Sequence, residues 1–418
     1  MALDIDGNNV SQTQSPAKRL LSVEEARAIM LDAVCRQDSE KIPLNDALGR
    51  FLAKAVKATG DQPPFDASAM DGYALRSCDT PGYLRVAGEA AAGHGFAGRC
   101  EAGMAIRIST GAAVPEGADT VVMQENVRRE GDGVDVAAVP AGQHLRRRGG
   151  DFTAGSQLLA AGRRLDGLGL SMVAAAGLAE LSVTRRPRIA ILSSGDELAA
   201  PGTIAGPWQI FDSTTFGIAA WIQTWGGAAQ RLAVEKDDAE AIARAAKQAL
   251  SASDLLLVVG GASVGDHDLA RPALQKLGLE LLVGKVAVRP GKPTWFGRTA
   301  HGLVLGLPGN PASALVCTQI FLRPILEKML GLATQEGLST HRARLATPLP
   351  ANGPREHYLR GHLDSDDRGR LVARAYEKQD SSLLSVFAAA NALIRLPPKA
   401  PALDAGALVD LLPLDTVW

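Results

Sequence analysis

The sequence predicts a multidomain α/β plus β fold, in which a doubly wound parallel α/β domain is joined to β-rich regions on both sides. Between residues 188 and 331, apolar runs alternate with stretches of helical periodicity, a pattern typical of a parallel sheet covered by helices. Between residues 60 and 150, and again after residue 335, short alternating runs are separated by glycine-rich turns, which favours small barrels or sandwiches. The chain has 418 residues, too many for one ordinary core, so several domains are expected.

The first half of the chain is expected to contain a helix on each side of its β-rich region. Residues 22–37 form one apolar stripe at helical spacing, and Ser22 and Glu25 are placed to form a capping box. Residues 163–181 return to helical periodicity, with Asp166 as the candidate N-cap.

The alternating segment is expected to supply the strands and helices of the α/β domain. The expected strands are residues 188–195, 254–261 and 302–309, and the expected helices are residues 216–226, 237–250, 269–278 and 311–331. We expect Asp237 to cap the second of these helices and Pro324 to kink the last one. After residue 335, further strands are predicted at 342–349, 356–363, 370–377 and 391–397, with a hairpin turn at 367–369.

Composition and charge exclude several classes of protein. Charged residues make up 21% of the chain and the formal net charge is −1, so no basic surface for nucleic acid is indicated. The polar N-terminus lacks the apolar core of a signal peptide, and the most apolar stretch, residues 168–179, is too short to span a bilayer. The four cysteines show no CxxC spacing, which argues against a zinc ribbon or a disulfide scaffold. A cytoplasmic protein without membrane contact is therefore expected.

The candidate chemistry lies at the carboxyl ends of the predicted parallel strands, where open sheets of this kind bind ligands. These ends run into residues 193–197, 260–268 and 307–311, and residues 285–293 supply Lys and Arg side chains. The glycines let backbone N–H groups approach an anion, and a helix N-terminus adds partial positive charge. The carboxylates would repel a bare phosphate, so they require a bridging Mg²⁺ or act as proton acceptors. The pattern predicts a phosphate cradle with metal-binding carboxylates.

Each element of this pattern also has a purely structural interpretation. Consecutive glycines after a strand are often only a tight turn, and Glu197 or Asp268 alone would more often be a helix cap or a surface acid. The arginines at 146–148 fit a solvated loop equally well. His267 and His301 are not predicted as ligands, because no other His or Cys lies at ligand spacing. The combination of loops and cations favours the functional interpretation, while GxGxxG and P-loop patterns are absent from the sequence.

Several motifs, taken in order, resemble those of the molybdopterin molybdenumtransferases, the bacterial MoeA family that is similar to the gephyrin E domain. The matching segments are residues 66–74 (DASAMDGYA), 107–111 (RISTG), 122–125 (VMQE), 146–151 (RRRGGD), 194–197 (SGDE), 260–266 (GGASVGD), 289–293 (RPGKP) and 307–311 (LPGNP). The resemblance covers residues 20 to 390. Ala67 and Thr214 stand where members usually carry asparagine, so local hydrogen bonds are expected to differ at these two positions. Arg289 stands where some members carry lysine; it preserves the charge and offers a bidentate fork.

The resemblance implies four domains and a homodimer whose active cleft lies between the subunits. The implied domains are an elongated connecting domain (residues 18–58 and 150–185), a β-rich domain (59–149), a molybdopterin-binding α/β domain (186–333) and a C-terminal β-barrel (334–418). The implied reaction inserts molybdate into adenylated molybdopterin and releases AMP with Mg²⁺ present, giving molybdenum cofactor. The molybdopterin adenylyltransferase and acceptor molybdoenzymes are implied as transient partners.

The resemblance also assigns roles to residues by position. The implied catalytic set is Asp71, Thr110, Asp151, Glu197, Asp237, Asp268, Lys285 and Arg289, with Glu197 and Asp268 as Mg²⁺ ligands. The implied substrate-binding set is Ser194, Gly195, Asp196, Gly260, Gly261, Ser263, Gly265, Lys292, Pro308, Gly309, Asn310, Pro311, Ser313, Arg360 and Ser381.

Other interpretations stay open at this point. A molybdopterin adenylyltransferase or a CinA-like nucleotide hydrolase would use the same α/β domain, although the long β region that begins at residue 66 disfavours both. A scaffold that has kept the fold for assembly is a further alternative. The retained acids and cations argue against an inactive site, but they are compatible with an added binding role.

Overall fold

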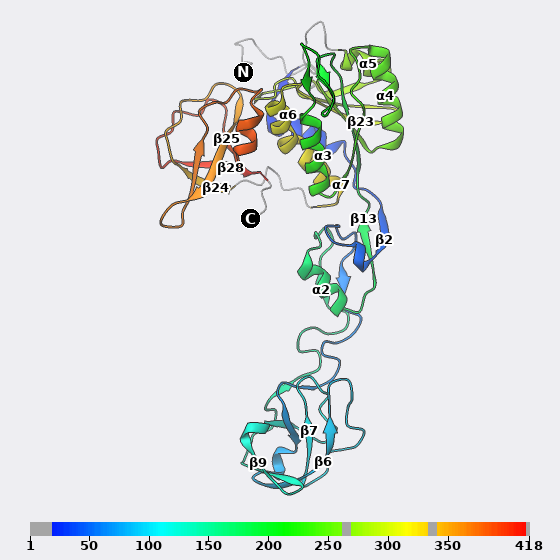
Figure 1. Cartoon of the computed structure of the whole chain (residues 1–418), viewed down its shortest axis with the longest axis vertical. Helices are drawn as coiled ribbons and strands as arrows, with labels where there is room; N and C mark the ends of the chain where they lie inside the picture. Colours follow the sequence, from blue (N-terminus) through cyan, green and yellow to red (C-terminus); the bar gives the residue numbers. More distant parts are fainter. Residues whose placement is uncertain (1–18, 261–268, 333–340, 415–418) are drawn as a thin grey trace, which may run out of the picture. The chain divides into compact units, whose positions relative to one another are not determined.

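The computed structural model describes residues 19–260, 269–332 and 341–414, and the chain divides into two compact units. The inserted unit is Lys41–Val183, and the discontinuous unit contains the described residues up to Glu40 and from Thr184 onward (Figure 1). Within the described residues, no helix is long and apolar enough to cross a membrane.

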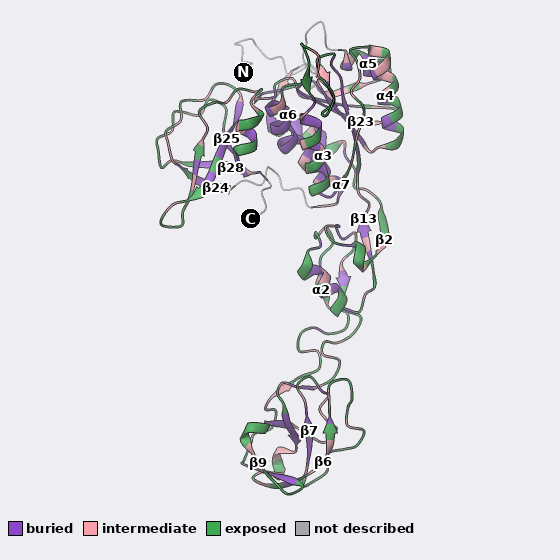
Figure 2. Ribbon diagram, viewed as in Figure 1, coloured by how far each residue is buried: buried purple, intermediate pink, exposed green. Residues whose placement is uncertain are grey.

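The inserted unit contains a six-stranded mixed sheet in the order β8-β5-β7-β6-β10-β9. Its strands are β5 (Gly72–Leu75), β6 (Gly82–Ala90), β7 (Met104–Ile108), β8 (Thr120–Met123), β9 (Val127–Glu130) and β10 (Gly133–Val136). Strand β5 is buried on both faces, because Tyr73 and Leu75 pack into one core and Ala74 into a second. Strand β7, its neighbour in the sheet, is also mostly buried (Figure 2). A β carbon at Gly72 would lie 1.9 Å from the Val122 carbonyl oxygen, so the strand pair requires glycine beside Asp71.

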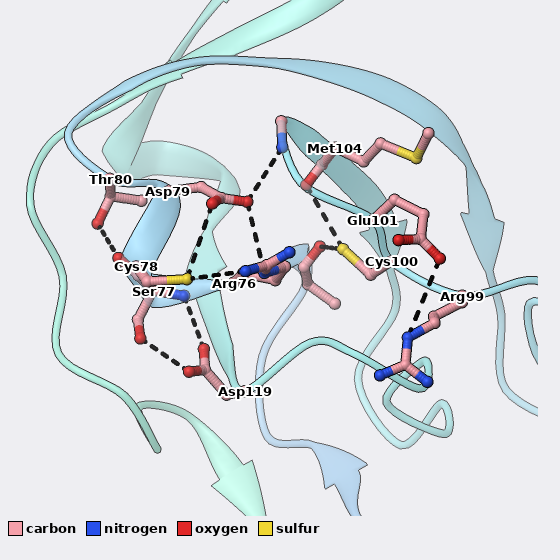
Figure 3. A network of polar contacts seen from close by, with 12 residues as sticks. Arg76, Ser77, Cys78, Asp79, Thr80, Arg99, Cys100, Glu101, Met104 and Asp119 are labelled. Atoms are coloured by element: carbon pink, nitrogen blue, oxygen red, sulfur yellow. Dashed lines mark hydrogen bonds and ion pairs between the residues drawn. The ribbon is translucent and has the colours of Figure 1, made fainter.

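A polar network fixes the turn that follows β5 in the inserted unit (Figure 3). Ser77 donates from its backbone N–H and its hydroxyl to the Asp119 carboxylate, at 2.7 and 2.8 Å. Asp79 accepts from the Gly103 N–H at 3.0 Å and lies 3.7 Å from the Arg76 guanidinium. These contacts stay within the sheet's own turns, so they have a structural role.

The remainder of the inserted unit consists of short strand pairs and one helix. The strands are β2 (Ser39–Pro43), β13 (Glu180–Thr184), β3 (Val56–Lys57), β12 (Gln157–Leu159), β4 (Ala67–Ser68) and β11 (Leu145–Arg146), paired as β2–β13, β3–β12 and β4–β11. Helix α2 (Gly167–Ala175) begins at Asp166, whose carboxylate accepts from the Gly169 N–H at 2.7 Å. The predicted cap is confirmed, but the helix is shorter than residues 163–181.

The discontinuous unit is built on a six-stranded sheet in the order β17-β14-β18-β23-β22-β19. Its strands are β14 (Arg188–Ser193), β17 (Ala228–Arg231), β18 (Leu255–Val259), β19 (Glu280–Val283), β22 (Trp295–Thr299) and β23 (Gly302–Leu307). The first four strands in this order are parallel, whereas β22 pairs antiparallel with β23 and β19 pairs antiparallel with β22. The doubly wound α/β prediction is confirmed, and the antiparallel edge arises because β22 and β23 are joined by a tight hairpin instead of a crossover helix.

Helices cover both faces of this sheet (Figure 1). They are α3 (Thr214–Thr224), α4 (Ala239–Ala252), α5 (Ala270–Gln275), α6 (Pro311–Cys317) and α7 (Arg323–Met329), and α1 (Val23–Asp32) contacts α7. Helices α4 and α5 pack on the face that carries Ala190, Leu192 and Val258. Helices α3 and α6 contact each other on the other face.

Three details of these helices differ from the sequence-based expectation. Helix α4 is capped by Asp238, not Asp237, since the Asp238 carboxylate accepts from the N–H groups of the first turn. Helix α1 has the predicted Ser22 capping box but ends at Asp32. A π-helix (Thr318–Leu322) separates α6 from α7, so the irregularity expected near Pro324 begins before that residue.

The C-terminal part of the discontinuous unit is a closed β-barrel, as predicted. Its strands are β24 (His341–Leu345), β25 (Glu356–Ser365), β26 (Leu371–Ala375), β27 (Ala392–Leu396) and β28 (Leu408–Pro413), and the β25–β27 pairing closes it. Strand β21 (Val288–Arg289) adds to β25 in parallel, and helix α8 (Leu384–Ala389) follows β26. The predicted hairpin turn is present: Asp366 accepts from the Arg368 and Arg370 N–H groups, and Gly369 has a φ of +71°.

Candidate active site

The carboxyl ends of three parallel strands lie level with one another. Strand β18 stands between β14 and β23, and its last residue, Val259, pairs with Ser193 on one side and Leu307 on the other. The loops that begin at Ser194, Gly260 and Pro308 therefore leave the same edge of the sheet, as the sequence predicted. This is the edge at which parallel α/β sheets bind ligands.

These loops approach one another backbone to backbone. Gly260 donates its N–H to the Leu307 carbonyl at 3.2 Å and has a φ of +90°. A β carbon there would lie 3.2 Å from the Ser194 carbonyl oxygen, and one at Gly309 would lie 3.4 Å from the Gly260 α carbon. Glycine is required at 260 both by the left-handed backbone and by the close approach. Gly261, Ser263, Gly265 and Asp268 lie outside the described residues.

The loop after β14 places several acids together. Glu197 lies over Gly195, since a β carbon at Gly195 would be 2.5 Å from the Glu197 Oε2 atom. Asp196 Oδ1 accepts from the Asp237 N–H at 3.4 Å. Strands β15 (Leu198–Ala199) and β16 (Ile210–Phe211) fix this loop, and the Ile210 N–H donates to the Glu197 carbonyl at 2.7 Å. The acids are exposed, and among the described residues no three His, Cys, Asp or Glu side chains are grouped to hold a metal ion.

The loop after β23 reaches the segment that follows β26. Asn310 stands at the N-cap position of α6, with Pro311 in the first turn. The Asn310 Nδ2 atom donates to the Ser381 hydroxyl at 3.0 Å, and the Ala312 N–H donates to the Ser381 carbonyl at 3.0 Å. Ser313 is buried one turn into the same helix. Two residues that the sequence placed at one site, Asn310 and Ser381, are therefore in contact.

Arg360 carries a guanidinium group that the described part of the chain satisfies only in part. Its side chain is fully buried, and Nη2 donates to the Asp380 carbonyl at 2.8 Å. The Nε and Nη1 atoms are buried without a hydrogen-bond partner among the described residues. Burial lowers the pKa of the Arg360 guanidinium, because the charged form loses solvation. Because Asp380 precedes Ser381, this group lies close to the N-terminal end of α6.

The other predicted cations lie on the loop of residues 285–293, which a backbone hydrogen bond closes. Strand β20 (Lys285–Val286) pairs with β1 (Leu20–Leu21), and the Val286 N–H donates to the Lys292 carbonyl at 3.1 Å. Gly291 has a φ of +121° and lies against the buried Cys317 thiol, to which a β carbon would come within 2.2 Å. Lys285, Arg289 and Lys292 are exposed on this loop.

Arg289, on the strand paired with β25, and Arg360, within β25, point to opposite faces of the barrel wall. Strand β21 pairs Arg289 with His357, and His357 and Arg360 are three positions apart, so they point to opposite sides of the strand. Arg289 and His357 line a cavity of about 600 Å³ at one end of the barrel. Burial, and then the charge of Arg289, lowers the pKa of His357 to about 4. The sequence did not single out His357, because nothing local marks a barrel end.

The inserted unit brings Asp71 and Thr110 together. Asp71 Oδ1 accepts from the Thr110 N–H at 2.6 Å and from its hydroxyl at 2.8 Å, and these bonds lower the pKa of the exposed Asp71 carboxyl. Asp151 is exposed, and its N–H donates to the Gln62 carbonyl at 2.9 Å; within the described residues it makes no hydrogen bond to Asp71.

The arginine run at 146–148 is tied to local acids. Arg147 is paired with Asp66 at 2.7 Å, and Arg148 with Asp61 at 2.6 Å. These two arginines thus contact the 61–66 loop, so residues 147 and 148 are not part of a freely solvated loop. They are exposed pairs of the kind that contribute little to stability on their own.

Three family models match successive parts of the chain. They are the MoeA N-terminal region (domain I and II) at residues 21–177, the probable molybdopterin binding domain at 190–328, and the MoeA C-terminal region (domain IV) at 342–414. Together they cover most of the described residues.

Similar proteins cover nearly the whole chain. A molybdopterin molybdenumtransferase of Nostoc sp. is 35% identical and one of Haemophilus influenzae is 33% identical; the alignments cover 91% of this chain and 91% of the first relative, and 95% and 99% for the second. The crystal structure of the molybdopterin biosynthesis MoeA protein from Pyrococcus horikoshii superposes with a TM-score of 0.84 at 29% identity, covering 96% of this chain and 100% of that chain.

Proposed function

Since this chain belongs to the MoeA family and is a molybdopterin molybdenumtransferase, we propose that it inserts molybdate into adenylated molybdopterin, with Mg²⁺-dependent release of AMP. The product is molybdenum cofactor. The proposal includes a homodimer, the four domain ranges expected from the sequence, and a cytoplasmic location.

The buried, half-satisfied guanidinium of Arg360 carries this proposal. An unpaired buried charge costs several kcal/mol, so a chain tolerates it where an anion completes the pairing. A tetrahedral dianion fits, because the N–H groups of both Nε and Nη1 still need an acceptor, and Ser381 and the N-terminal end of α6 lie near Arg360 through Asp380. We therefore assign molybdate to Arg360, Ser381 and Ser313, with Lys285, Arg289 and Lys292 from the neighbouring loop as further anion-handling groups.

The level strand ends support an adenylate site beside the molybdate. Without side chains at Gly260 and Gly309, the loops approach each other backbone to backbone, and the N–H groups of such glycine loops are suited to bind a phosphate. The proposed cradle comprises Ser194, Gly195, Asp196, Gly260, Gly261, Ser263, Gly265 and Pro308 to Pro311. It is continuous with the contact between Asn310 and Ser381.

The exposed carboxylates after β14 fit a magnesium ion. Mg²⁺ is commonly held by one or two carboxylates together with substrate phosphates and water, and it does not need an all-protein cage. Glu197 and Asp268 are the proposed ligands, with Asp237, whose N–H contacts Asp196, beside them. When bound, the ion would neutralise charge on the phosphate that leaves with AMP.

The hydrogen-bonded pair Asp71 and Thr110, together with Asp151, completes the proposed site from the inserted unit. We propose that a partner subunit supplies these residues to each cleft. The molybdopterin adenylyltransferase and acceptor molybdoenzymes are the proposed transient partners.

The experiment that tests the reaction uses the full chain with adenylated molybdopterin, Mg²⁺ and molybdate. AMP and molybdenum cofactor should appear together, and omission of molybdate should suppress cofactor formation. Consumption of ATP with molybdopterin would instead identify an adenylyltransferase. If neither substrate pair is consumed while the chain still binds adenylated molybdopterin, the scaffold interpretation is correct.

A further inference from the structure

The cavity at the end of the C-terminal barrel has the size and lining of a small-molecule site. Its volume is about 600 Å³, within the usual range for ligand pockets. The apolar wall of the cavity continues the barrel core and is formed by Leu349, Leu359 and Leu396. We call this cavity the barrel mouth; its polar lining includes Arg289, His357, Arg374, Tyr376, Glu377 and Gln379.

The pairing of β21 with β25 directs Arg289 to the barrel mouth. Leu359 packs into the barrel core, and His357 lies two positions before it, so both point inward. Arg289 is opposite His357 in the parallel register and lines the same cavity. Arg360, on the other face of β25, belongs to a different environment. The barrel mouth is thus a separate compartment that shares only Arg289 with the proposed active site.

The charge of the barrel mouth is positive. The guanidinium group of Arg289 forms no hydrogen bond or ion pair within the described part of the chain, and Glu377 is the acid among the lining residues. Arg374 follows the core-facing Ala373 and pairs with His362, so its side chain points to the other face of the sheet. Burial, followed by the charges of Arg289, Arg360 and Arg355, keeps the pKa of His357 at about 4. The imidazole is therefore neutral at physiological pH and offers one donor and one acceptor.

We propose that the barrel mouth binds a small organic anion, which consists of a flat apolar body and one phosphate or carboxylate group. The leucine side chains contact the body, and the guanidinium group of Arg289 binds the anionic group through charge-assisted hydrogen bonds. An inorganic anion would leave the apolar walls unused. This proposal goes beyond the proposed function and does not depend on it.

Calorimetric titration of the full chain with four probes tests the proposal. Phenyl phosphate and benzoate carry both parts of the ligand, inorganic phosphate carries only the charge, and phenol carries only the body. Phenyl phosphate or benzoate should bind at least about 10-fold more tightly than inorganic phosphate or phenol, since the charge and the apolar body each contribute about 1 kcal/mol or more to the binding free energy. Comparison of phenyl phosphate with benzoate identifies the anionic group.

Matched variants locate the binding. Arg289→Ala should weaken binding of the better probe by about 10-fold or more, because it removes a charged hydrogen bond. Arg368→Ala, at the exposed hairpin turn of the same barrel, should leave it unchanged. Thr347→Trp should block the cavity that Thr347 lines. Release of AMP by Thr347→Trp should match the wild-type rate, which separates this site from the proposed reaction.

Two results would overturn the proposal. One is a probe with both parts that binds no more tightly than inorganic phosphate. The other is binding that survives both Arg289→Ala and Thr347→Trp in proteins whose circular dichroism is that of the wild type.

Discussion

The side-chain amide of Asn310 donates a hydrogen bond of 3.0 Å to the hydroxyl of Ser381, which joins the third strand-end loop of the α/β sheet to the segment after β26. A second bond, from the Ala312 N–H to the Ser381 carbonyl, fixes the same junction. Ser381 therefore aligns the N-terminal end of α6 with the chain next to Arg360. The anion proposed for Arg360 should be sensitive to this residue.

Substitution Ser381→Ala should raise the molybdate concentration needed for half-maximal AMP release by about 10-fold, because one hydrogen bond near a charged ligand is lost. The dependence on adenylated molybdopterin should change less. Ser382→Ala is the matched control, since its hydroxyl bonds only to Asp380 among the described residues. Equal molybdate dependence in both variants would remove Ser381 from the anion site.

Substitution Arg360→Met should separate stability from activity. The methionine removes a buried charge with unpaired Nε and Nη1 atoms, so unfolding in the absence of ligand should cost about 1 kcal/mol more. Turnover should fall by about 10²-fold or more, since the anion loses its charged donor. Thermal unfolding and AMP release measure the two effects, with Arg368→Met as control. A drop in stability would show that Arg360 is satisfied without a ligand.

Substitution Glu197→Gln should reduce turnover by about 10²-fold while substrate still binds, because the glycine loops and cations remain. Asp268→Asn should have a comparable effect. Quench-flow measurement of AMP, together with equilibrium binding of adenylated molybdopterin, distinguishes turnover from affinity. Near-normal AMP release from Glu197→Gln at saturating Mg²⁺ would exclude a metal-binding role for this carboxylate.

His357 should make the barrel sensitive to acid. The pKa of this buried group is about 4 in the folded chain and about 6.5 when exposed, so the unfolded state binds a proton more readily below pH 6.5. Its contribution to stability is complete above pH 6.5 and is lost as the pH falls toward 4. Groups around it are Arg289, Arg355 and Arg360, with Arg374, Tyr376 and Glu377 also lining the cavity.

Hydrogen exchange of the β25 amides at pH 7 and pH 5 measures this contribution. The wild type should lose about 2 kcal/mol of opening free energy at pH 5 through His357, and His357→Gln should lose correspondingly less. An identical loss in both proteins would show that other groups cause the acid sensitivity.

Much of the fold could be predicted because local patterns determine it. The apolar run that forms β18 and the capping box at Ser22 appear within a few neighbouring residues. The Asp237 prediction was wrong by one position: two adjacent aspartates are candidate caps, and Asp238 is the one whose carboxylate accepts from the N–H groups of the first turn. The antiparallel β22 was not predicted, because its register depends on packing against β23.

The candidate site, like the fold, could be predicted from the sequence only where local patterns determine it. The level ends of β14, β18 and β23 follow from the parallel alternation, which the sequence displays. The unpaired atoms of Arg360 and the placement of Arg289 beside His357 depend on strand pairing between distant segments. No local pattern encodes such a register, so the structure was needed to assign the two arginines to different faces of one strand.

Mixed dimers test whether a partner subunit completes the cleft. Asp71 and Glu197 belong to different units of the chain, and the proposal pairs Asp71 of one subunit with Glu197 of the partner subunit. The inactive variants Asp71→Ala and Glu197→Gln are co-refolded. About half of randomly paired dimers are mixed, and each mixed dimer has one cleft with both substitutions and one with neither.

About a quarter of the wild-type AMP release should therefore return on mixing. A site built within one chain would leave a substitution in every cleft, and no activity would return. Separate affinity tags on the two variants allow the mixed dimers to be isolated, in which the activity should reach about half of the wild-type value. The unmixed variants, refolded in parallel, provide the baseline activity. Isolated mixed dimers that are no more active than this baseline would refute the shared cleft.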